Sequence, residues 1–157
     1  MLTLERLKET LEYNPDTGLF KNKINRGNVT AGTIAGSRHS RGYIQIAIDG
    51  VDYLAHNLAW FYMTGEWSTY LVDHRDRVES NNKWINLREA TYSENGANSI
   101  SKGGRSGIKG VFPHGSGWRA RIKVNYKTIN LGTFRTKEEA SVIYMEAAYK
   151  YFGEFSE

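Results

Sequence analysis

The segment Val72–Asn98, which reads VDHRDRVESNNKWINLREATYSENGAN, constrains the fold of this chain more than any other stretch. Thr91, followed by Glu94 three residues later, forms a capping box that predicts the start of a helix. Upstream of that helix the residue pattern predicts a strand, a polar loop and a second strand. Their expected ranges are Tyr70–His74, Arg75–Lys83 and Trp84–Leu87.

The same segment concentrates side chains that suit hydrolysis of a phosphodiester. That reaction needs a base that deprotonates water near neutral pH and a divalent cation that offsets charge on the phosphate. Histidine suits the first task, and carboxylate and carboxamide oxygens bind hard cations. His74 is therefore the candidate base, and Asp73 with an asparagine can bind the ion. Turn chemistry alone is the alternative explanation for an asparagine-rich loop.

The ordered set of these residues resembles the HNH, or ββα-metal, nuclease motif, and specifically the homing endonucleases of phage introns and their free-standing relatives. The resemblance implies that Asp73 and Asn95 bind one Mg²⁺ or Mn²⁺, that His74 is the general base and that Asn86 holds the histidine ring. The family usually has a glycine in the loop, where this chain reads Asp76-Arg77-Val78.

The N-terminal part carries local signals for helices and a hairpin. Thr3 is a candidate cap for a first helix, and Asp49-Gly50 between two alternating runs predicts a hairpin of Tyr43–Ile48 and Val51–Leu54. Ala55–Met63 is expected to be a helix ended by Gly65. This region also resembles the nuclease family. His56 within it is interpreted as a buried ring bonded to backbone in preference to a catalytic residue.

Positive charge is concentrated in the C-terminal part. The net charge is −1 over Met1–Asn98 and +5 over Ser99–Glu157, and Ser99–Arg135 has eight cations and no carboxylate. Such a concentration favours a polyanionic partner. Three strands are expected at Ile108–Phe112, Trp118–Val124 and Thr128–Phe134. Thr136 then caps a helix with an apolar stripe, formed by Ala140, Ile143, Tyr144, Ala147, Ala148 and Tyr151.

Alternation along the second of these strands predicts one packed face and one cationic face. The motifs GIKGV, GWRARI and LGTF, within about Gly107–Phe155, resemble the AP2 DNA-binding domain, which reads a major groove with a three-stranded sheet. A solvated cationic face is the alternative. The candidate DNA-binding residues are Lys109, Phe112, His114, Arg119, Arg121, Lys123, Lys127, Thr128 and Asn130.

The expected fold class is α+β, with a nuclease domain at 1–98, a ββα core at about 70–98, a basic Gly/Ser linker at 99–106 and an AP2-like domain at 107–157. The chain has no cysteine, which excludes disulfides and thiolate zinc sites and fits a cytoplasmic protein. It has no apolar run that indicates a membrane span or a signal peptide.

Together these features predict a site-specific, metal-dependent DNA endonuclease that needs no small-molecule cofactor and binds duplex DNA as a monomer. Whether it nicks or breaks the duplex, and whether it dimerises, stays open. A non-catalytic DNA-binding regulator on a decayed nuclease scaffold is the alternative, with the altered loop as its support. An RNA-directed protein is disfavoured because a sheet suits a wide major groove, which RNA lacks.

Overall fold

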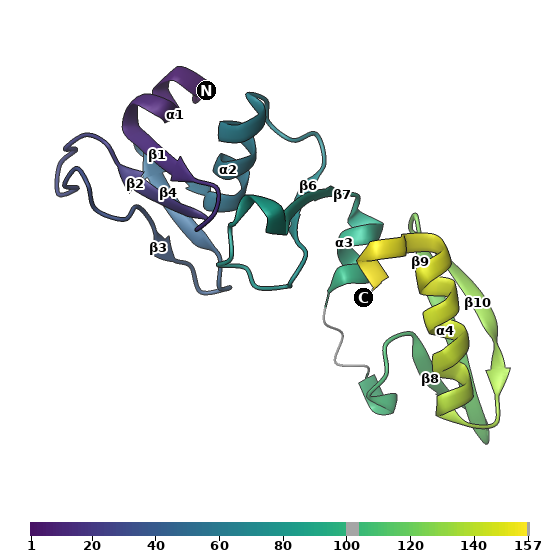
Figure 1. Cartoon of the computed structure of the whole chain (residues 1–157). Coiled ribbons are helices and arrows are strands. Elements are labelled where there is room, and N and C mark those ends of the chain that lie inside the picture. Colours follow the sequence, from purple (N-terminus) through teal and green to yellow (C-terminus); the bar gives the residue numbers. More distant parts are fainter. Residues whose placement is uncertain (100–103, 157) are drawn as a thin grey trace. The chain divides into compact units, whose positions relative to one another are not determined.

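The computed structural model describes residues 1–99 and 104–156, and it is an α+β structure with small antiparallel sheets (Figure 1). Its contacts divide the chain into two compact units, Met1–Glu89 and Ala90–Glu157. This division differs from the expected domain boundary at residue 98, because the helix that follows Thr91 packs within the C-terminal unit. Within the described ranges, no helix is long and apolar enough to span a membrane.

The expected linker at 99–106 is described only in part. Residues 100–103 lie outside the described residues, and Gly104–Ser106 forms a 3₁₀ turn, η2. The hydroxyl of Ser106 bonds to both the N–H and the carbonyl of Ile108, at 3.0 and 2.9 Å, and donates to the carbonyl of Val111 at 2.6 Å. These bonds, with Gly110 at φ +73°, form a turn where the first C-terminal strand was expected to begin.

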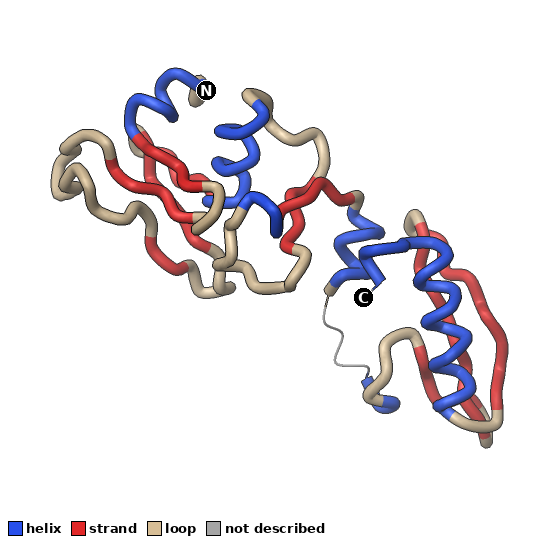
Figure 2. Tube along the Cα trace, in the orientation of Figure 1, coloured by secondary structure: helices blue, strands red, loops and turns tan. Residues whose placement is uncertain are grey.

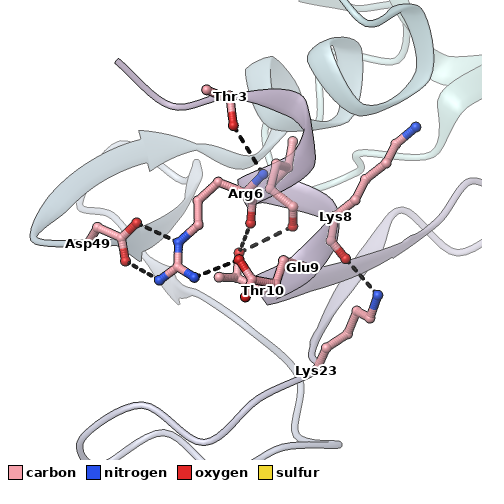
Figure 3. A network of polar contacts seen from close by, with 8 residues as sticks. Thr3, Arg6, Lys8, Glu9, Thr10, Lys23 and Asp49 are labelled. Carbon is pink, nitrogen blue, oxygen red and sulfur yellow. Dashed lines mark hydrogen bonds and ion pairs between the residues drawn. The ribbon is translucent and has the colours of Figure 1, made fainter.

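The N-terminal unit begins with helix α1, Leu4–Thr10, which Thr3 caps as expected. It leads into the antiparallel pair β1, Leu11–Asn14, and β2, Leu19–Asn22. Figure 3 shows how α1 is tied to the rest of the unit: the Arg6 guanidinium donates two hydrogen bonds to Asp49, at 2.8 and 2.7 Å, and a third to Glu9. The hydrogen bonds from Arg6 hold the pKa of the Asp49 carboxyl below its usual range.

Asp49 lies in the turn of the expected hairpin, which is present as β4, Ile44–Ile48, and β5, Val51–Leu54. Asp49 and Gly50 both have positive φ, 50° and 79°, as a tight two-residue hairpin turn requires. The short strand β3, Ser37–Arg38, pairs with β4 after a long loop, drawn in tan in Figure 2.

Helix α2, Ala55–Thr64, follows the hairpin and ends at Gly65, which is left-handed as predicted. Its inner side packs into the main core of the N-terminal unit. The fully enclosed members of that core come from α1, the first two strands, the hairpin and α2, and they include Leu7, Leu11, Phe20, Ile46, Ile48, Leu58 and Ala59.

The segment around Asp73 and His74 forms two short strands joined by a polar loop. Strand β6 is Leu71–His74 and pairs with β7, Leu87–Ala90. The second strand starts three residues later than predicted, because Trp84–Asn86 is a 3₁₀ turn, η1. The N–H of Trp84 donates to the carbonyl of Pro15 at 2.9 Å, which holds this turn against the β1–β2 connection.

The C-terminal unit contains helix α3, Tyr92–Asn98, with the predicted capping box of Thr91 and Glu94. A three-stranded antiparallel sheet follows, in the order β10-β9-β8. Helix α4 lies along this sheet (Figure 1). The bounds are Val111–His114 for β8, Gly117–Val124 for β9, Lys127–Phe134 for β10 and Lys137–Phe152 for α4, and a last 3₁₀ turn, η3, is Gly153–Ser156.

The alternation predicted for β9 is confirmed, since Ala120 and Ile122 are buried while Arg119 and Arg121 are half-exposed. The predicted stripe on α4 is wrong at its end. Tyr151 is 42% exposed, and the neighbouring Phe152 is 7% exposed and packs with Ile122 instead.

Candidate active site

The candidate residues Asp73 and His74 end strand β6, and both are buried, at 6% and 5% exposure. Adjacent residues of a strand point to opposite faces, so the two side chains have different partners. Asp73 Oδ2 accepts a hydrogen bond from Arg88 Nε at 3.0 Å, within an ion pair buried on both sides. His74 Nε2 lies 2.9 Å from Asn82 Oδ1. Asp73 is thus held by an ion pair, and His74 by a contact with a carboxamide.

The contact with Asn82 indicates which ring nitrogen of His74 can act as a base. A carboxamide oxygen accepts hydrogen bonds and cannot donate, so this contact is a hydrogen bond in the tautomer whose proton is on Nε2. That tautomer has its lone pair on Nδ1.

Asn86, expected to hold the histidine ring, bonds to the loop instead. Its Nδ2 donates to Asp76 Oδ1 at 2.9 Å and to the Asn81 carbonyl at 2.7 Å, and its Oδ1 accepts from the Asp76 N–H at 3.1 Å. Its backbone carbonyl accepts from the N–H of Arg75 at 2.9 Å. Asn86 therefore supports the backbone that follows His74, and Asn82 makes the contact with the ring.

Asp76 is the centre of the loop's hydrogen bonds. Partial burial opposes its ionisation, but hydrogen bonds from Asn81, the Val78 N–H and Asn86 hold the pKa of the Asp76 carboxyl below its usual range. An ionised carboxylate that accepts three hydrogen bonds keeps a short polar loop in one conformation.

The loop keeps its turn without the glycine that the resembled nuclease family usually has there. Arg77, which occupies that position, has φ +62°, in the left-handed region that glycine adopts most easily. The N–H of Arg77 donates to the His74 carbonyl at 3.0 Å, which closes the turn directly after the candidate base. The turn is thus kept with a non-glycine residue.

The β1–β2 hairpin contacts the backbone at Asn82, a relationship that the sequence did not predict. The Tyr13 hydroxyl donates to the Asn82 carbonyl at 2.6 Å, and burial raises the pKa of Tyr13 above its usual range. At Gly18 a Cβ atom would lie 2.4 Å from the backbone of Asn82 and Lys83, so only glycine allows this approach. The residues NPDTG at Asn14–Gly18 are typical of a turn, but local sequence does not indicate which segment lies against that turn.

A second histidine lies against the candidate base. The ring centroids of His56 and His74 are 5.0 Å apart with an edge-to-face arrangement, and Tyr43 lies 5.3 and 6.1 Å from them. His56 was expected to be a buried ring bonded to backbone, and it is buried, at 6% exposure. Its Nδ1 has no hydrogen-bond partner within the described residues, so the expected backbone bond is absent at that atom. Burial, and then the charge of His74, lowers the pKa of His56 to about 3.

The two candidate metal ligands fall in different units. Asp73 is in the N-terminal unit, and Asn95 is a half-buried residue of α3 in the C-terminal unit. Within the described residues there is no group of three or more His, Cys, Asp or Glu side chains placed to hold a metal. One carboxylate and one carboxamide suit Mg²⁺, which keeps several waters and needs few protein ligands. The donor chemistry therefore fits, and joint binding by both residues stays a prediction.

Most of the candidate DNA-binding residues share one face of the C-terminal sheet. Directly opposed residues of antiparallel strands lie on the same face, and Phe112 pairs with Arg119, Arg121 with Asn130 and Lys123 with Thr128. Arg121 lies 4.3 Å above the exposed Phe112 ring, and Arg119 contacts His114.

Two candidates lie elsewhere. Lys127 pairs with Val124, so strand alternation directs its side chain away from the face of Lys123. Lys109 precedes β8, and its ammonium donates to three carbonyls at the end of α3. The residues that share the cationic face are Phe112, His114, Arg119, Arg121, Lys123, Thr128 and Asn130.

Comparison with family models matched part of the chain. Residues 53–97 match a family model described as HNH endonuclease, and the matched range includes Asp73, His74, Asn86 and Asn95. The match supports an HNH nuclease, a class that typically uses a divalent metal and acts on DNA. Comparisons with curated proteins and with solved structures gave no match.

Proposed function

We propose that this protein is a site-specific, divalent-metal-dependent DNA endonuclease of the homing type, with His74 as general base. The observation that carries the proposal is the contact between His74 Nε2 and Asn82 Oδ1 at the buried end of β6, within the range that matches HNH endonucleases. This contact orients the ring and favours the tautomer with its proton on Nε2, and both suit a base that acts on one bound water.

Asp73 and Asn95 are the residues that would hold the cation. When bound, a divalent cation supplies positive charge that stabilises the phosphate and the leaving 3′-oxygen. Arg88 fixes the Asp73 carboxylate by an ion pair at 3.0 Å, and Asn86 fixes the backbone that follows His74. His74 takes a proton from the attacking water, whose oxygen bonds to phosphorus as the bond to the 3′-oxygen breaks. The products are a 5′-phosphate and a 3′-hydroxyl.

The C-terminal sheet is proposed to select the DNA site in the manner of an AP2-like domain. Arg119, Arg121 and Lys123 alternate along β9 beside the exposed Phe112. An arginine can bond guanine O6 and N7 bidentately, Asn130 can read adenine, and other cations contact phosphates and set the register. With one candidate base per chain, a monomer nicks the duplex or cuts its strands in turn.

The test is cleavage of a randomised duplex library and of genomic DNA from the source organism, with Mg²⁺ or Mn²⁺ against an EDTA control. His74→Ala should lower the cleavage rate by about 10²- to 10⁴-fold while DNA affinity stays unchanged. His39→Ala, at an exposed position outside the site, is the matched control.

Metal-dependent and His74-dependent ends that map to one sequence would support the endonuclease. Salt-sensitive binding of DNA with no cleavage under any metal would instead support the regulator. Loss of DNA binding in His74→Ala with an intact fold would count against the role assigned to the histidine.

A further inference from the structure

Helix α3 is a short element that depends on its surroundings. It has seven residues, Tyr92–Asn98, and Gly96 lies within it. Helices of this length are unstable alone, and glycine inside a helix lowers stability further. The segments that pack against α3 therefore determine the conformation of Asn95 on this helix.

The apolar contacts of α3 lie within the C-terminal unit. Ala97 packs against a buried cluster that includes Ile122 of β9 and Phe152 of α4. Helix α3 also contacts η3, whose Phe155 belongs to the same cluster. The helix is thus part of the hydrophobic core that the C-terminal sheet and α4 build.

Lys109 binds the C-terminal end of α3. Its Nζ donates to the carbonyls of Gly96, Ala97 and Ser99, at 2.9, 2.6 and 2.7 Å. These carbonyls include ones that a helix end leaves without intrahelical partners, and a cation there also favours the helix dipole. An ammonium has three donors, so it can bond to all three of these carbonyls. Lys109 is half-buried, in the turn that Ser106 fixes before β8.

A second contact holds the other end of the same helix. The Ser93 hydroxyl accepts a hydrogen bond from the N–H of Asn125, at 2.9 Å, in the turn between β9 and β10. Asn95 lies in sequence between Ser93 and the carbonyls that Lys109 binds. Both attachments come from the sheet unit, one from before its first strand and one from its second turn.

From these contacts we infer that Lys109 is a positioning residue for the proposed metal ligand Asn95, so that contacts within the C-terminal unit set the conformation of that ligand. This inference rests on the proposed function for its metal. In this inference Lys109 does not contact DNA, although the motif that contains it suggested a DNA contact. It also implies that truncation after Ser99 removes metal binding together with DNA affinity.

The test uses the full chain with Lys109→Met, which keeps the length of the side chain but removes its donors. Mn²⁺ binding is measured by titration calorimetry without DNA, and amide hydrogen exchange is followed in Tyr92–Asn98. We expect Mn²⁺ affinity to fall by about 10- to 100-fold and exchange in α3 to accelerate. DNA affinity in EDTA should stay at the wild-type value.

Two further variants separate positioning from general stability. Lys109→Arg retains donors for the carbonyls and should restore most of the Mn²⁺ affinity. Lys137→Met removes an exposed lysine at the start of α4 and should change neither Mn²⁺ affinity nor exchange in α3. Melting temperatures of all variants show whether each is folded at the temperature of the titration.

The outcomes distinguish this inference from the proposed function. Wild-type Mn²⁺ affinity and wild-type exchange in Lys109→Met would overturn the inference alone. Lost DNA affinity with unchanged Mn²⁺ affinity would overturn it in favour of a direct DNA contact by Lys109. A wild-type chain that binds no divalent metal would overturn the proposed function, and the inference with it.

Discussion

The Asp73 carboxylate and the Arg88 guanidinium form an ion pair of 3.0 Å in which each side chain is only 6% exposed. Removing either charge alone would take the ion-pair partner away from a buried group, which is far more costly than losing an exposed pair. Arg88 comes from β7 and Asp73 from β6, so the pair also joins the two strands of the sheet that contains the candidate base.

Arg88→Ala should therefore lower the free energy of unfolding by about 3 to 5 kcal/mol. The reason is that the buried Asp73 carboxylate loses this ion pair. Urea denaturation measures the change. Adding Asp73→Asn to Arg88→Ala should recover part of the loss, because the double variant removes both charges of the pair.

Arg6→Ala is the comparison for this experiment. Arg6 pairs with Asp49 in the network of Figure 3, but the side chains are 36% and 50% exposed. Solvent weakens such a pair, so its loss should be much smaller than that of Arg88→Ala. Equal losses would contradict the importance of burial in the Asp73–Arg88 pair.

Asn82→Leu should reduce the rate of cleavage without changing affinity for Mn²⁺. The carboxamide that contacts His74 Nε2 is removed, so the ring loses its fixed orientation and tautomer. We expect a loss in kcat of about 10- to 100-fold, below that of removing the base itself. Single-turnover kinetics with saturating metal measures it, and an unchanged rate would exclude an orienting role for Asn82.

Stability should depend on pH through His56. Its pKa is lowered from 6.5 to about 3 by burial and then by His74, so the unfolded chain takes up a proton that the folded chain does not. The contribution of His56 is full above pH 6.5. It declines by about 1.4 kcal/mol for each pH unit below that value, toward pH 3.

Urea unfolding at pH 7.5 and pH 5.5 tests this dependence. His56→Phe removes the titrating group and should flatten the difference between the two pH values. His39→Phe, at an exposed position, should keep it. A wild-type chain equally stable at both values would be inconsistent with a buried neutral His56.

Arg121→Ala should weaken DNA binding and its salt dependence. If the guanidinium above Phe112 neutralises one phosphate, the slope of log affinity against log salt should fall by about 0.9. Lys137→Ala, on the exposed start of α4, should leave the slope unchanged. Fluorescence anisotropy across a salt series measures both, and a steeper or equal slope in Arg121→Ala would place Arg121 outside the interface.

Local signals predicted much of the fold. The caps at Thr3, Thr91 and Thr136 and the Asp49-Gly50 turn are all present where expected. A cap or a tight turn depends on contacts between residues within four positions of one another, so it can be predicted from the local sequence. The burial pattern of β9 followed from alternation for the same reason.

The sequence also predicts the chemistry of the candidate site, because residue types and their order are visible without a fold. Asp73 and His74 stand at the end of a buried strand, inside the range that matches HNH endonucleases. Which asparagine contacts the ring was decided by tertiary structure. Asn82 rather than Asn86 is next to His74, because the first hairpin holds the Asn82 backbone through Tyr13.

Tertiary structure likewise determined which unit contains α3 and which groups Lys109 contacts. The lysine lies in a cationic segment, in a motif from which a DNA contact was expected, yet its ammonium bonds to carbonyls 10 to 13 residues earlier in the chain. The unit that α3 joins depends on a hydrophobic core shared with Ile122 and Phe152. Such contacts depend on how distant segments pack together, and neither residue type nor local spacing specifies that packing.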